Sequence, residues 1–123
     1  MLEAGVVVAM SGAPIHWHLP AGRTAGSIPD TRELWDVLWS HRDELMGFAH
    51  SHPGSGAPSP SYTDVTTFAA IEASLGRRLD WWITSRDGLA LVSWAGPLRV
   101  HYDTVPITCE PPWLHELRRL SYA

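Results

Sequence analysis

Two short segments of the sequence carry side chains that could bind a metal ion together. Residues 50–53 read HSHP, and residues 61–64 read SYTD after a loop rich in glycine and proline. Side chains two residues apart in a strand point to the same side, so His50 and His52 can reach one ion at the end of a strand. Asp64, in the first turn of the helix that follows, can supply a third ligand. Two histidines and one carboxylate leave a fourth tetrahedral position for water, which is the arrangement of a catalytic zinc site.

Each motif taken alone also has an ordinary structural explanation. Two exposed histidines on a strand give the same H-x-H pattern, and S-x-x-D is also the N-cap of many helices that bind no metal. The two motifs together, with Pro53 after the histidines and a strand–loop–helix context, are more specific. We therefore predict that His50, His52 and Asp64 bind Zn²⁺.

The pattern of apolar residues predicts the elements that must position these side chains. Val6, Val7 and Val8 are consecutive and indicate a strand buried on both faces, whereas Leu34 and Leu38 recur at helical spacing. The predicted strands are residues 5–10, 15–19, 47–52, 79–84, 89–94 and 98–102, and the predicted helices are residues 31–45, 61–75 and 112–120. The order β-β-α-β-α-β-β-β-α predicts an α/β fold in which helices flank a mixed β-sheet.

The composition of the whole chain limits the possible classes of protein. A length of 123 residues with 45% hydrophobic residues predicts one folded domain over residues 1–123. The net charge of −4 and the absence of a basic stripe argue against nucleic acid or an acidic membrane as a partner. The single cysteine, Cys109, and the lack of a recognisable signal peptide or long apolar run lead us to expect a cytoplasmic protein.

The two motifs together resemble the pattern of the JAMM/MPN+ (JAB domain) zinc metallopeptidases, in particular the compact prokaryotic members. That pattern is a glutamate, a long gap, HSHP, a loop and S-x-x-D, and both motifs of this chain match it. The resemblance implies the MPN/JAB fold, which is cytidine-deaminase-like, and zinc bound by His50, His52 and Asp64. It also implies that Ser61 helps to hold the oxyanion of the tetrahedral intermediate.

The same resemblance points to Glu3 as the catalytic glutamate. The family has this residue near the start of the first strand, where it acts as general base. Glu3 lies immediately before the strand predicted at residues 5–10 and 47 residues before His50. A residue so close to the end of the chain could instead be frayed. Glu33 and Glu44 are rival candidates, but both fit ordinary roles on the predicted helix.

The function implied by the resemblance is hydrolysis of an amide or isopeptide bond in a protein or peptide. The expected substrate is a ubiquitin-like or sulfur-carrier protein that is cut after its C-terminal glycines. Two alternatives stay open. One is a catalytically inactive MPN-type scaffold or binding domain, and the other is a zinc hydrolase of a small-molecule amide.

The remaining histidines and the cysteine are weaker candidates for a site. His16 and His18 repeat the H-x-H spacing, but an ordinary hairpin strand explains them better than a second metal site or a substrate contact. We expect His41, on the apolar stripe of a helix, to be a buried core histidine. We expect Cys109 to be a small packed side chain, because no nearby histidine suggests an activated thiol.

Overall fold

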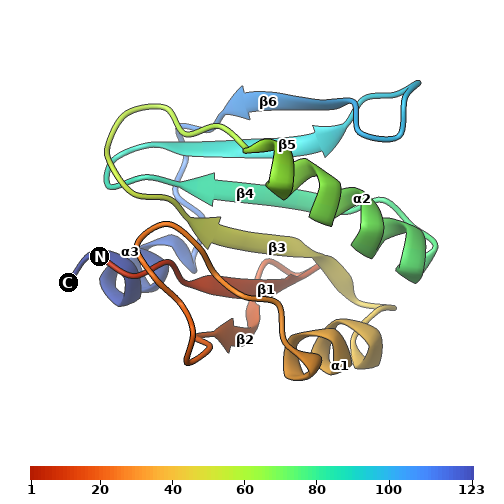
Figure 1. The fold of residues 1–123 in the computed structure, drawn as a ribbon, viewed down its shortest axis with the longest axis horizontal. Helices are drawn as coiled ribbons and strands as arrows, with labels where there is room; N and C mark the ends of the chain where they lie inside the picture. The colour runs from red at the N-terminus through yellow and green to blue at the C-terminus, as the bar shows by residue number, and fades with distance from the viewer.

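A six-stranded mixed sheet, in the strand order β2-β1-β3-β4-β5-β6, organises the chain (Figure 1). The structure is a computed structural model that describes all 123 residues. The strands are β1 (Gly5–Ala9), β2 (Pro14–His18), β3 (Leu45–Ser51), β4 (Asp80–Thr84), β5 (Leu89–Trp94) and β6 (Tyr102–Pro106). The helices are α1 (Arg32–Ser40), α2 (Tyr62–Leu75) and α3 (Leu114–Tyr122). The predicted element order and the α/β class are confirmed.

The connection between β3 and β4 determines where the candidate site forms. These two strands are parallel, whereas every other neighbouring pair in the sheet is antiparallel. A parallel pair needs a crossover, and α2 provides it by running back over the sheet. The loop of residues 52–61 joins the C-terminal end of β3 to the N-terminus of α2, so these two ends lie at the same edge of the sheet. This topology brings the segment after the histidines back towards them.

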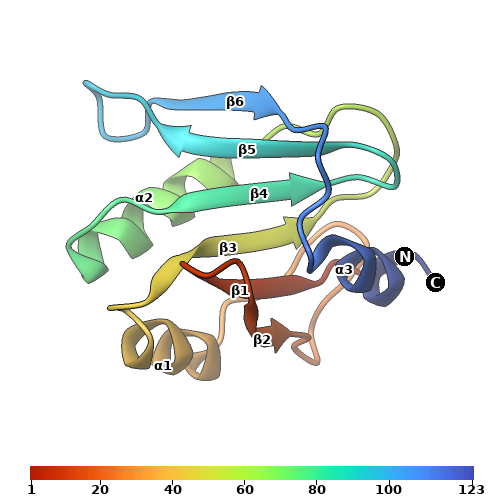
Figure 2. The ribbon, with the colours of Figure 1, turned by 180° about the vertical axis from the view of Figure 1, so that it is seen from behind.

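The helices cover both faces of the sheet. Helices α1 and α2 lie on one face (Figure 1), and α3 lies on the opposite face (Figure 2). The two faces carry separate clusters of buried apolar side chains. Trp81 belongs to the cluster under α1 and α2, and Trp82 belongs to the cluster under α3. On β1, Val7 belongs to the cluster under α1 and α2, whereas Val6 and Val8 belong to the cluster under α3. The prediction that this strand is buried on both faces is therefore confirmed.

Gly47 allows the central strands to approach each other closely. A Cβ atom at Gly47 would lie 1.6 Å from the backbone oxygen of Asp80, its register partner on β4. Any side chain at this position would push β3 and β4 apart. The glycine that the sequence places at the start of the third strand is therefore required for the pairing that carries the histidines.

Several predicted boundaries are wrong. The first helix ends at Ser40, because a turn over residues 41–44 leads into β3, where Leu45 pairs with Ala9. The last strand begins at Tyr102, since Trp94 pairs with it and residues 95–101 form the hairpin loop. The last helix begins at Leu114 and continues to Tyr122.

Two predictions about single residues are also wrong. His41 is half exposed and contacts the Glu44 carboxylate, because the helix ends before it instead of carrying it into the core. Cys109 is exposed in the segment between β6 and α3. None of the three helices is long and apolar enough to span a lipid bilayer.

Candidate metal centre

The end of β3 presents His50 and His52 on the same side of the sheet. His50 is buried, with 4% of its surface exposed, and it pairs in register with Gly5 and Ile83. His52 follows the last residue of the strand. Its backbone N–H donates to the carbonyl of Thr84 at 2.8 Å, which extends the β3–β4 pairing by one residue. The Nε2 atoms of the two histidines lie 3.0 Å apart.

A capping box at the start of α2 fixes the carboxylate of Asp64. The Ser61 hydroxyl oxygen accepts a hydrogen bond from the Asp64 backbone N–H at 3.0 Å, and the Asp64 carboxylate accepts one from the Ser61 N–H at 2.9 Å. The same carboxylate reaches the histidines. Its Oδ1 lies 3.5 Å from His50 Nε2, and its Oδ2 lies 3.1 Å from His52 Nε2. The cap that begins the helix therefore also orients a candidate ligand.

The spacing of these donor atoms fits a zinc ion. Tetrahedral zinc with bonds of about 2.0–2.1 Å places its ligand atoms roughly 3.3 Å apart. The nearest side-chain donor atoms of His50, His52 and Asp64 are 3.0, 3.1 and 3.5 Å apart in pairs, so two of the three distances are slightly shorter than this value and one is slightly longer. Two neutral imidazoles and a carboxylate are also ligands that zinc accepts. The residues present thus match Zn²⁺ in chemistry and in spacing.

Glu3 lies at the same place and is not frayed. Only 5% of its surface is exposed, and its backbone N–H donates to Thr24 O at 2.8 Å. One of its carboxylate oxygens and the ligand nitrogens of His50 and His52 all lie within 4.8 Å of one another. Glu3, His50 and His52 thus form a possible metal site, with Asp64 in contact with both histidines. The structure brings all five predicted site residues together.

The electrostatic environment gives the two carboxylates opposite properties. Burial raises the pKa of Glu3 to about 7, and the nearby Asp64 charge raises it too, while His52 opposes the shift. Burial also acts to raise the pKa of Asp64, but hydrogen bonds from His50 and His52 outweigh it and hold this pKa well below its usual range. Burial acts to lower the pKa of His52, yet its contact with Asp64 leaves the pKa raised. One carboxylate is thus fixed as an anion, and the other can exchange a proton near neutral pH.

A cavity of about 560 Å³ opens beside these residues. Its polar end is lined by the five predicted site residues: Glu3, His50, His52, Ser61 and Asp64. Its other end is apolar and runs between α1 and α2 over β3 and β4. A substrate bound in the cavity would therefore contact the donor cluster directly.

Helix α3 supports the site from the opposite face of the sheet. The Tyr122 hydroxyl donates to the backbone oxygen of His52 at 2.6 Å and is 3.1 Å from that of Thr84. The Ser121 hydroxyl lies 2.8 Å from Ser51 Oγ, which accepts a hydrogen bond from the Ala4 N–H at 2.9 Å. The Ser121 backbone oxygen accepts from the N–H of residue 2 at 3.0 Å. Helix α3 thus holds both the histidine strand and the segment that carries Glu3.

The sequence analysis missed this support. The contacts join residues 38 to 119 positions apart, and no local pattern marks Ser121 or Tyr122 as different from other residues of an amphipathic helix. The only feature of the sequence that could have indicated these contacts is the polar pair Ser121 and Tyr122 at the end of α3.

The rival candidates lie elsewhere. Glu33 is on the exposed side of α1, 3.8 Å from His16 Nε2, and Glu44 contacts His41. His18 is buried on β2, and its Nε2–H donates a hydrogen bond to the carbonyl oxygen of Pro29 at 2.8 Å. Neither His16 nor His18 belongs to the group of side chains that could hold a metal ion.

A comparison with protein families places the chain in one of them. Residues 3–95 match the family described as prokaryotic homologs of the JAB domain, so the chain belongs to this family and thus to the JAMM/MPN proteins. The match begins at Glu3 and includes both motifs, and the six-stranded mixed sheet with three helices is consistent with the JAB/MPN fold. The family generally consists of JAMM-type metallohydrolases. A comparison with curated proteins finds no match.

Proposed function

We propose that the protein is a zinc-dependent metallopeptidase or isopeptidase of the JAMM type. The observation that carries the proposal is the convergence of three donor groups, from His50, His52 and Asp64, within 3.0–3.5 Å of one another at the wall of a cavity. A second carboxylate, that of Glu3, lies beside them. This complete set favours hydrolysis over a scaffold role.

Each residue then has a role in amide hydrolysis. His50, His52 and Asp64 would hold Zn²⁺, which when bound polarises the scissile carbonyl and lowers the pKa of water towards 7. Glu3 accepts a proton from the attacking water and delivers it to the leaving amine. The Ser61 oxygen already accepts from the Asp64 N–H, so its own proton is free to point into the cavity and stabilise the oxyanion.

For the substrate, we propose a ubiquitin-like or sulfur-carrier protein cut after its C-terminal glycines. Support for this substrate comes from membership of the JAB family alone. A small-molecule amide would use the same donors, so cleavage of a protein fusion separates the two substrate classes.

The first test is the zinc content of the purified protein by elemental analysis. We expect about one zinc per chain in the wild type and a loss of most of it in His52→Ala, because the variant lacks one of three ligands. His16→Ala is the matched control, since this histidine lies outside the donor cluster. A wild type that takes up no zinc even after loading would contradict the proposal.

The second test is hydrolysis of a ubiquitin-like protein fused through its Gly-Gly end to a reporter. The wild type should release the reporter, and Glu3→Gln should retain zinc but lose at least about 100-fold in rate, because the proton acceptor is gone. Equal rates of reporter release by the wild type and Glu3→Gln would show that Glu3 is not the proton acceptor.

A further inference from the structure

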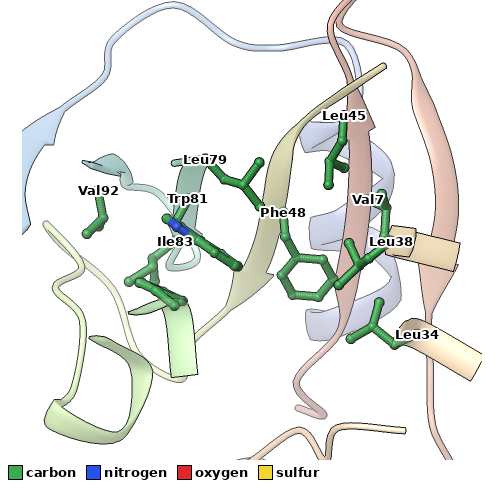
Figure 3. Close-up of a cluster of buried hydrophobic side chains, with 10 residues drawn as sticks. Val7, Leu34, Leu38, Leu45, Phe48, Leu79, Trp81, Ile83 and Val92 are labelled. Carbon is green, nitrogen blue, oxygen red and sulfur yellow. The ribbon is translucent and has the colours of Figure 1, made fainter. Parts of the chain in front are cut away.

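The apolar end of the cavity forms a slot that the proposed reaction does not yet use. We define the slot by the side chains of Leu34, Leu38, Phe48, Phe68, Ile71 and Trp81. Figure 3 shows Leu34 and Leu38 extending from α1 towards the ring of Phe48, with Trp81 on the other side of that ring. The whole cavity, about 560 Å³, has the size of a site for a small organic group, and the slot adjoins the metal donors.

The walls of the slot are part of the packed core. Phe48, Phe68 and Trp81 are each less than 10% exposed. The Phe68 and Trp81 rings stack with their centroids 4.2 Å apart, and the Trp81 indole N–H donates to the buried Glu72 carboxylate at 3.0 Å. These contacts position the Phe68 and Trp81 rings without any help from a ligand. Water inside it finds few hydrogen-bond partners, and an apolar group that replaces this water is stabilised.

The charges around the cavity are all of one sign apart from the histidines. Glu3, Asp30 and Asp64 line it, and none of the nine arginines of this lysine-free chain does. An acidic group placed in the apolar slot would lose its hydration and find no arginine or lysine to pair with, because the proposed Zn²⁺ is held by the donors at the other end of the cavity. A neutral apolar group meets neither penalty.

We infer that the substrate carries an apolar group of the size of leucine or phenylalanine within one residue of the hydrolysed amide, and no acidic group there. This inference rests on the proposed amide hydrolysis and adds the chemistry that selects the substrate. The slot holds the apolar group while the amide lies against the donor cluster. A substrate with glycine on one side of the hydrolysed amide fits this inference when its apolar group lies on the other side.

A series of quenched fluorescent peptides tests the preference. Each peptide contains one glycine-flanked amide in which a single neighbouring position, on one side or the other, is Gly, Leu, Phe or Asp. We expect Leu or Phe on one side to raise kcat/KM by about 10- to 100-fold over Gly, and Asp to lower it. Equal kcat/KM values for Gly, Leu and Phe on both sides would overturn the inference.

A pair of variants on α2 tests the location. Thr67 lines the cavity one turn before Ile71, so Thr67→Phe narrows the entrance to the slot. We expect it to reduce the Phe-to-Gly ratio of kcat/KM by about tenfold. Thr66 is exposed and does not line the cavity, so Thr66→Phe should leave this ratio unchanged. Equal ratios in both variants would place the preference outside the slot.

A binding measurement separates failure of the slot from failure of the proposed function. The ¹⁵N-labelled Glu3→Gln protein, with and without zinc, is titrated with the Phe and Gly peptides while the indole N–H signal of Trp81 is followed. We expect the Phe peptide to shift this signal and the Gly peptide to leave it in place. If the enzyme hydrolyses the Gly, Leu and Phe peptides equally and the Phe peptide does not shift the Trp81 signal, the inference about the slot is wrong while the proposed function stands. Absence of zinc binding and of all hydrolysis overturns the proposed function, and the Trp81 signal then still decides whether the slot takes an apolar group.

Discussion

Glu3 carries a stability penalty that its proposed role requires. Its pKa is about 7 in the folded protein, mainly because of burial, against an ordinary value of 4.5. The fold therefore favours the protonated carboxyl, and this contribution to stability is complete below pH 4.5 and lost as the pH rises through 7. The metal-free protein should become less stable over this interval. The energy involved is roughly 2–4 kcal/mol, at 1.36 kcal/mol for each pKa unit.

Glu3→Gln should therefore stabilise the metal-free protein at pH 8 while it removes the proton acceptor. Glutamine has nearly the same shape and does not ionise, so we expect the variant to gain roughly 2–4 kcal/mol over the wild type at pH 8 and little at pH 4.5. Urea unfolding at the two pH values measures the difference. A gain of the same size at both values would show that ionisation is not its cause.

At the level of the elements, the parallel pairing of β3 and β4 depends on Gly47. We expect Gly47→Ala to destabilise the protein by about 3 kcal/mol or more, because its Cβ would lie 1.6 Å from Asp80 O and the strands must separate. Gly26→Ala is the control, since a Cβ there has no neighbour within 4 Å. Chemical denaturation of both variants measures the effect, and equal stability would mean that the strands accommodate the methyl group.

Helix α3 should influence zinc affinity although it contributes no ligand. Tyr122→Phe removes the hydrogen bond to the His52 carbonyl, so the end of β3 is held less firmly. We expect zinc affinity to fall by about tenfold, the lower limit for loss of a group that orients a ligand. Tyr62→Phe serves as control because Tyr62 is 79% exposed. Competition with a chelator of known affinity measures the zinc affinity of both variants. An unchanged affinity in Tyr122→Phe would mean that α3 contributes packing and has no influence on the metal site.

Features formed by residues close together in the sequence could be predicted, whereas features formed by residues far apart in the sequence could not. The histidine pair and the Ser61–Asp64 cap are local patterns, and the topology that joins them follows from one strand–helix crossover. The strand expected at residues 98–102 was wrong because exposed Leu98 and Val100 alternate as a buried strand would. The Tyr122 contact and the slot arise from long-range packing, for which no short pattern exists.

For the whole molecule, zinc should act as a stabilising ligand whose effect depends on pH. Binding to the folded state alone raises stability by about 2.7 kcal/mol when free zinc is 100 times Kd. The raised pKa of His52, in which contact with Asp64 outweighs burial, means that protons compete with zinc in mildly acid solution. We expect EDTA to lower Tm by several degrees at pH 7.5 and by less at pH 5.5. Thermal unfolding with zinc or EDTA measures this, and identical Tm values at pH 7.5 would contradict binding to the folded state.

The contacts of α3 also set the order in which the site can be completed during synthesis. Of the residues that build the site, the ribosome adds Glu3 first, His50 and His52 next, and Ser121 and Tyr122 only after a further 69 residues or more. Until those last two side chains emerge, neither the segment of Glu3 nor the carbonyl of His52 has its partner from α3. A nascent chain that has not yet reached α3 therefore exposes an unfinished site, and the proposed amide hydrolysis would begin only after α3 has packed against the sheet.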